Sequence, residues 1–162
     1  MIVVSDTSCL SGLFLIDQTK LLGHLYGKVI VPSLVWAEFL ELEKFGFDPQ
    51  TILTHIDLQV LTPQNQTLVA ILKEQLDAGE SEAIVLAKEV SADLLLLDER
   101  QGTTIARNMG LKTTGILGIL LEAKNQKLIL TIKPILTDLR QKAGFYLSEK
   151  LELQVLQAAG EF

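Results

Sequence analysis

Short apolar runs of strand length alternate with longer segments of helical pattern along this chain. Residues 2–4, 29–31 and 94–97 are such runs, and Asp6 and Asp98 stand just beyond the first and the last of them. Strands that alternate with helices favour right-handed βαβ units and a mainly parallel sheet with helices on both faces. We therefore expect a three-layer α/β fold with a sheet of about four to five strands.

Other elements follow from the same patterns. A helix is predicted over residues 10–25, another from Pro32 and Ser33, and one over 62–77, with a strand or a connection at 55–61. Gly79 is interpreted as a break before a buried helix at 83–87. Later elements are a helix over 99–109, a strand over 112–114 and helices over 115–125, 134–142 and 149–159.

Length and composition favour one globular domain. The chain has 162 residues, of which 48% are apolar and 21% charged, and we expect a single domain over 1–162 with a C-terminal helical extension at about 134–160. The single cysteine, Cys9, excludes an internal disulfide and fits a reducing cytoplasm. Apolar runs fall short of the roughly 18 to 20 residues that span a bilayer, so we expect no membrane contact.

Carboxylates occupy the positions where such a fold builds its site. Parallel sheets bind ligands at the carboxyl ends of their strands, which brings Asp6 and Asp98 to one edge. Glu38 shares a helix face with Leu34, Leu42 and Phe45, so it is predicted to lie in an apolar stripe. Glu82 falls in the first turn of the buried helix, where the helix dipole favours an anion.

Each of these acids alone has an ordinary explanation, as a helix cap or as the partner of a buried lysine or arginine. Four carboxylates in one place would repel one another and raise each other's pKa unless a positive charge lay among them. Hard cations such as Mg²⁺ and Mn²⁺ prefer oxygen ligands, and they can activate water for phosphodiester hydrolysis. His24 and His55 have no motif around them, and we interpret both as structural. Cys9 lies in an apolar helix start, and we interpret it as a core residue rather than a nucleophile.

Charge is unevenly distributed. The chain carries a net charge of −6, yet residues 1–99 hold 5 Lys/Arg against 15 Asp/Glu, and residues 100–150 hold 9 against 3. An acidic part that holds metal beside a basic part that holds a polyanion would have this pattern, and so would solvated helix faces.

Four motifs, in order, resemble the PIN-domain ribonucleases, particularly the toxin type of bacterial toxin–antitoxin pairs. They are Val-Ser-Asp-Thr-Ser at 4–8, Val-Pro-Ser-Leu-Val-Trp-Ala-Glu-Phe at 31–39, Gly-Glu-Ser-Glu-Ala-Ile-Val-Leu-Ala at 79–87 and Leu-Leu-Leu-Asp-Glu-Arg at 95–100. The stretch 113–124 is similar to a subgroup of the same family. The resemblance covers nearly the whole chain and implies a Mg²⁺- or Mn²⁺-dependent endoribonuclease.

The resemblance also implies roles for individual residues. The catalytic, metal-binding acids would be Asp6, Glu38, Glu82 and Asp98. Thr7 or Ser8 would hydrogen-bond the first carboxylate or a metal-bound water, with Glu80 and Glu99 as auxiliary ligands. The family commonly has Asp at the third position, so Glu80 and Glu82 both stay candidates there.

Partners follow from the same comparison. RNA is the implied substrate, with phosphate contacts from Arg100, Arg107, Lys112 and Lys124. A small antitoxin protein and a homodimer or higher oligomer are the implied protein partners.

Three other classes are weighed against this one. A receiver domain needs an acidic pair after the first strand, where this chain has Thr7 and Ser8. An aspartyl-nucleophile phosphatase needs a second Asp at the place of Ser8. A catalytically inactive PIN-like module that binds a protein stays open.

Overall fold

The computed structural model describes residues 1–162 and contains one five-stranded, all-parallel sheet in the order β3-β2-β1-β4-β5. The strands are β1 (Val3–Ser5), β2 (Lys28–Pro32), β3 (Asp57–Leu61), β4 (Leu94–Leu96) and β5 (Thr113–Thr114). Ser5 pairs with Leu96 across the central pair of strands. The expected α/β architecture is confirmed, and residues 55–61 supply a strand from Asp57 onward.

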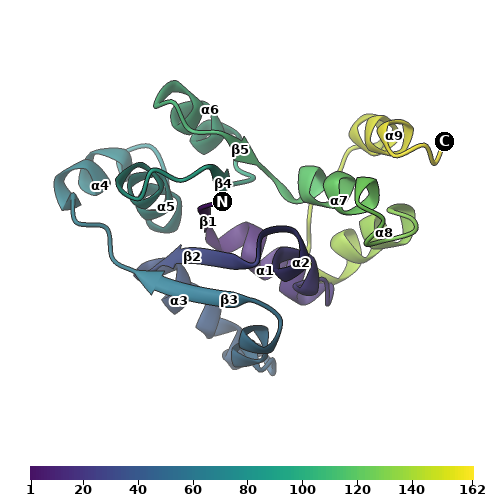
Figure 1. Cartoon of the computed structure of the whole chain (residues 1–162), viewed down its shortest axis with the longest axis horizontal. Helices are drawn as coiled ribbons and strands as arrows, with labels where there is room; N and C mark the ends of the chain where they lie inside the picture. The colour runs from purple at the N-terminus through teal and green to yellow at the C-terminus, as the bar shows by residue number, and fades with distance from the viewer.

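Helices cover both faces of this sheet, as Figure 1 shows, with α4–α6 grouped on one side and α7–α9 on the other. Their bounds are α1 (Thr7–Leu15), α2 (Lys20–Tyr26), α3 (Ser33–Leu40), α4 (Gln66–Leu72), α5 (Ala78–Glu89), α6 (Arg100–Asn108), α7 (Ile116–Asn125), α8 (Lys133–Lys142) and α9 (Glu149–Ala158). Two short 3₁₀ helices, η1 (Glu41–Phe45) and η2 (Pro49–Thr54), follow α3.

Alternation along the strands divides the interior into two cores. Val3 belongs to a cluster of 25 buried residues, and its neighbour Val4 belongs to a cluster of 14 on the opposite face. This follows from the strand geometry, in which successive side chains point to opposite faces. The larger cluster includes Leu136 of α8 and Leu156 of α9, so the C-terminal helices pack into the same core as the sheet.

Three local predictions were wrong. The helix predicted over 10–25 is two helices, separated where Asp17 takes a positive φ of 57°. The helix predicted over 62–77 runs only over Gln66–Leu72. It begins at Gln66 because the side chain of Asn65 rather than Thr62 accepts the capping hydrogen bond from Leu68. Gly79 is no break, since α5 starts at Ala78 and runs through it.

None of these helices is long and apolar enough to cross a bilayer.

Candidate functional site

Asp6 lies between the end of the central strand β1 at Ser5 and the start of α1 at Thr7. Its Oδ1 accepts a hydrogen bond of 2.9 Å from the backbone N–H of Cys9, which makes it the N-cap of α1. Only 1% of the residue is exposed, and Oδ2 is buried without any hydrogen-bond partner. Burial raises the pKa of Asp6 to about 7, and the negative charges of Asp98 and Asp77 add to the increase.

Asp98 follows the carboxyl end of β4, the strand that pairs with β1. Both of its carboxylate oxygens are 3.1 Å from the backbone N–H of Ile116, at the start of α7. The thiol of Cys9 donates a further hydrogen bond of 3.4 Å to Oδ2. Gly115 leaves the space that this carboxylate occupies, because a β-carbon there would collide with Oδ1. Burial raises the pKa of Asp98 as well.

Glu38 is joined to the first strand end through Thr7. The Thr7 hydroxyl donates a 2.8 Å hydrogen bond to Oε2 of Glu38. A β-carbon on Gly79 would lie 3.0 Å from Thr7 Oγ1 and 3.2 Å from both Glu38 oxygens, so glycine lets α5 approach this pair closely. Glu38, Thr7 and the start of α5 therefore meet beside Asp6.

The apolar stripe predicted around Glu38 was wrong. α3 ends at Leu40 and tightens into η1, so Phe45 leaves the predicted face and is exposed. The buried residues of α3 are Val35 and Phe39. Glu38 is next to this face rather than on it, which leaves its carboxylate free to reach Thr7.

A second acidic group forms at the start of α5. Asp77 caps the helix, with Oδ1 accepting a 2.8 Å hydrogen bond from the backbone N–H of Glu80. Glu80 is only 9% exposed, and its Oε2 is buried without a partner. Burial raises the pKa of Glu80 strongly, assisted by the neighbouring carboxyl groups of Asp77 and Glu99.

Glu99, at the start of α6, completes this second group. Its oxygens accept hydrogen bonds from the backbone N–H groups of Gln101 and Gly102 as the cap of α6. These hydrogen bonds lower the pKa of Glu99 although desolvation opposes them. The charge of Asp77, a residue outside the predicted set, raises the pKa of Asp6, Glu80 and Glu99 alike.

The structure places Glu82 elsewhere. Its Oε1 is 3.3 Å from the backbone N–H of Leu34, in the first turn of α3. The carboxylate therefore faces the N-terminus of α3, and none of its contacts joins it to Asp6 or Asp98. Of the two candidates for the third acid, Glu80 is the one whose pKa is raised by Asp77, which also raises the pKa of Asp6.

No lysine or arginine neutralises these acids. The four ion pairs of the chain are Lys44–Glu41, Lys124–Glu161, Arg140–Glu152 and Lys142–Asp138. Two buried carboxylate oxygens without a partner, in a set of hard oxygen donors, fit a divalent cation. As the side chains lie, no three of the candidate ligands converge on one point.

Comparison with known proteins identifies the fold family. A family model described as a PIN domain, DUF3368, matches residues 2–161. The chain belongs to this PIN-domain family. The PIN domain is generally a nuclease fold, and PIN domains usually bind divalent metals.

One solved structure shares the PIN-like architecture. It is a PilT N-terminus domain protein from the hyperthermophilic archaeon Sulfolobus solfataricus P2, with a TM-score of 0.55 and 22% sequence identity. The match covers 76% of this chain and 93% of that one, and at this identity it supports the fold alone. A search of curated proteins finds no match.

The basic residues predicted to contact RNA are not all near the acidic edge of this PIN domain. Arg100 follows Glu99 directly and begins α6 at that edge. Arg107 and Lys124 lie in the last turns of α6 and α7, and Lys112 precedes β5, so all three lie toward the amino ends of the strands. Lys124 is also held by Glu161 at 2.9 Å. Only Arg100 is well placed among the four.

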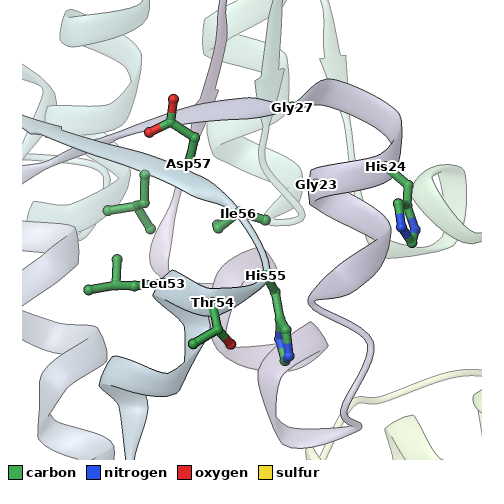
Figure 2. A pocket seen from close by; sticks show the side chains of 9 residues that line it. Gly23, His24, Gly27, Leu53, Thr54, His55, Ile56 and Asp57 are labelled. Carbon is green, nitrogen blue, oxygen red and sulfur yellow. The ribbon is translucent and has the colours of Figure 1, made fainter.

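A hollow of about 600 Å³ at the amino ends of β2 and β3 contains the two histidines. Figure 2 shows His24 on α2 and His55 before β3, with the Asp57 carboxylate pointing away from both rings. His55 Nδ1 lies 2.8 Å from the Thr19 hydroxyl. This hydrogen bond fits the structural interpretation of His55, whereas His24 is exposed.

Proposed function

We propose that this PIN domain is a Mg²⁺- or Mn²⁺-dependent endoribonuclease that hydrolyses phosphodiester bonds of RNA. The observation that carries the proposal is the two buried, partnerless oxygens, Oδ2 of Asp6 and Oε2 of Glu80, on acids that form no ion pair with lysine or arginine. Such groups cost folding free energy unless a ligand compensates them.

Asp6, Asp98, Glu38 and Glu80 are the residues that would hold the cation. A divalent cation supplies an activated water and charge stabilisation at the phosphate when it is bound. The chain's own residues orient these ligands: Cys9 and Ile116 fix the carboxylate of Asp98, and Thr7 fixes that of Glu38. Hydrolysis of the phosphodiester would add water to phosphorus and break one P–O bond of the backbone.

Metal binding can be tested before activity. Mn²⁺ is expected to raise the melting temperature of the wild type, because a ligand that binds only the native state stabilises it by mass action. Asp98→Asn should lose most of this increment, and it should melt at least as high as wild type in EDTA because a raised-pKa carboxyl group is gone.

Activity is the second arm of the test. Single-stranded RNA should be cleaved with Mg²⁺ or Mn²⁺, and cleavage should disappear in Asp6→Asn and Asp98→Asn while their circular dichroism spectra stay native. A wild type without any metal response and without cleavage contradicts the proposal. That result would favour the alternative of an inactive protein-binding module, for which the lack of three converged ligands is the supporting observation.

We extend the proposal to a cytoplasmic toxin that a small antitoxin protein holds inactive and that forms a homodimer or higher oligomer. This extension rests on the motif resemblance at 4–8, 31–39, 79–87 and 95–100. Induced expression in a bacterial host should arrest growth, and Asp98→Asn should not. Growth that continues under wild-type expression, at protein levels equal to those of the variant, contradicts the toxin role.

Light scattering of the purified chain tests whether it forms a homodimer or a higher oligomer.

A further inference from the structure

A hollow of about 410 Å³ adjoins the acidic cluster through Asp98 and Glu99. One wall is the face of α1 that carries Ser8 and Ser11, and the other wall is the connection between α8 and α9. Its volume lies within the roughly 300 to 1,000 Å³ of small-molecule sites. The hollow is therefore a place where part of a substrate can sit while another part reaches the acids.

Tyr146 lines this hollow from the α8–α9 connection and is 87% exposed. The residues on both sides of it are held in place. The backbone N–H of Phe145 donates to the Leu139 carbonyl at 3.0 Å, and Leu147 is buried. The connection thus presents an aromatic ring to solvent from a fixed backbone.

Arg140 supports this arrangement from α8. Its Nη2 donates a 2.8 Å hydrogen bond to the carbonyl oxygen of Leu147, and its Nη1 is 2.8 Å from Oε2 of Glu152 on α9. A backbone that is fixed before binding loses less conformational freedom when a ligand arrives. Arg140 is accordingly a positioning residue for Tyr146.

The lining also indicates which part of a nucleic acid enters. It includes the acids Asp98 and Glu99 and no lysine or arginine, so a phosphate would be repelled there. A neutral, flat nucleobase suits an exposed tyrosine ring, and the hydroxyls of Ser8 and Ser11 can hydrogen-bond its edge or the sugar.

We propose that Tyr146 is a stacking platform for an unpaired nucleobase next to the scissile phosphodiester, so that the hollow selects single-stranded RNA. The inference rests on the proposed nuclease function and adds a substrate-binding residue to it. Bases in a duplex already stack on their neighbours, and an isolated protein ring can take only a base that is free. Stacking of this kind tolerates every base, so we expect little sequence preference from this subsite.

The test measures binding of a fluorescein-labelled oligouridylate to full-length protein carrying Asp6→Asn, which prevents cleavage. In that background Tyr146→Ala should weaken binding at least about fivefold, as expected for one stacked base. Tyr146→Phe and Tyr146→Trp should bind like the parent, because they keep a π-face. Phe45→Ala, which removes another exposed aromatic residue from η1, is the matched control and should have no effect.

A second readout separates stacking from a general loss of structure. Trp36→Phe removes the only native tryptophan, and Tyr146→Trp then places a fluorescent ring at the hollow. Oligouridylate should quench this fluorescence, whereas the same RNA annealed to its complement should not. Arg140→Gln should weaken both the quenching and the binding.

The outcomes are distinct. The inference is overturned if Tyr146→Ala binds RNA as tightly as its parent, or if RNA does not quench the tryptophan at position 146. Either result leaves the nuclease proposal standing. The hollow would then be a candidate site for a protein segment instead. Both proposals are overturned if the Asp6→Asn parent binds no single-stranded RNA and the wild type cleaves none. Equal binding of duplex and single strand overturns the selectivity.

Discussion

The thiol of Cys9 donates a hydrogen bond to Oδ2 of Asp98, a residue from the other half of the chain, across 3.4 Å. The backbone N–H of the same Cys9 donates to Oδ1 of Asp6. One buried residue in the first turn of α1 thus contacts both strand-end carboxylates. Burial raises the pKa of this thiol well above its usual range, so Cys9 is a hydrogen-bond donor here and not a nucleophile.

Replacing Cys9 tests this link. Cys9→Ala should lower the free energy of unfolding by about 1 kcal/mol and reduce the cleavage rate several-fold, because Asp98 loses one of its two donors. Cys9→Ser should keep most of the rate, since a hydroxyl also donates. Urea unfolding and single-turnover cleavage measure the two effects. Equal rates for the Ala and Ser variants would show that the thiol does not position Asp98.

Glu80 and Glu82 can be told apart by matched substitutions. Glu80→Gln should remove most of the Mn²⁺-induced increase in melting temperature, because it removes a buried carboxylate of the cluster. Glu82→Gln should instead cost about 0.3 to 1 kcal/mol of stability, from its place at the N-terminus of α3, and keep the metal response. Differential scanning fluorimetry with and without Mn²⁺ decides between them, and the reverse result would restore Glu82 as the third ligand.

Gly115→Ala should damage the site with little damage to the fold. The backbone of Gly115 has φ −104°, which any residue adopts, so the defect is the collision of the new β-carbon with the Asp98 carboxylate. We expect a loss of cleavage of at least about tenfold, since small misplacements of catalytic groups are costly. Gly110→Ala is the control: it strains a positive φ of 85° in open space and should lower stability without changing the metal response.

Stability of the metal-free protein should fall as the pH rises. Asp6 has a pKa of about 7 in the folded protein against an ordinary value of 3.8, so from about pH 4 to 7 the folded chain holds a proton that the unfolded chain has released. Asp98 and Glu80 shift in the same direction. Urea unfolding in EDTA should show lower stability at pH 8 than at pH 5. The difference should shrink in Asp6→Asn, and stability that rises over this range in wild type would contradict the assignment.

Arg100 and Lys112 offer a comparison of phosphate contacts. Arg100→Gln should weaken RNA binding and its dependence on salt, because this residue begins α6 at the acidic edge. Lys112→Gln removes the same charge before β5, toward the opposite edge, and should change little. Fluorescence anisotropy at two salt concentrations measures both, and equal losses would mean that RNA extends across both edges.

Much of this arrangement could be predicted from the sequence because it depends on strand ends. The apolar runs at 2–4 and 94–97 placed Asp6 and Asp98 correctly at neighbouring carboxyl ends, since parallel pairing leaves little choice. Helix boundaries were harder. Gly79 usually weakens a helix, but here it lies in the first turn of α5, where Thr7 and Glu38 leave no room for a side chain.

The start of α5 also decides how its acids lie. With α5 starting at Ala78, Asp77 becomes its cap and Glu80, not Glu82, is turned toward Glu99. Cys9 and Tyr146 could not be found from pattern alone. Their roles depend on contacts between α1, the end of β4 and the α8–α9 connection, which the sequence separates by up to 138 positions (146 − 8).

The order β3-β2-β1-β4-β5 also has a consequence for synthesis. β1 emerges from the ribosome first, but its neighbour β4 follows about ninety residues later, and the donor that fixes Asp98 is Ile116. Tyr146 comes later still. A nascent chain therefore has no complete acidic centre until most of it has been translated, so the message that encodes it is exposed to the proposed cleavage only once the protein is nearly finished.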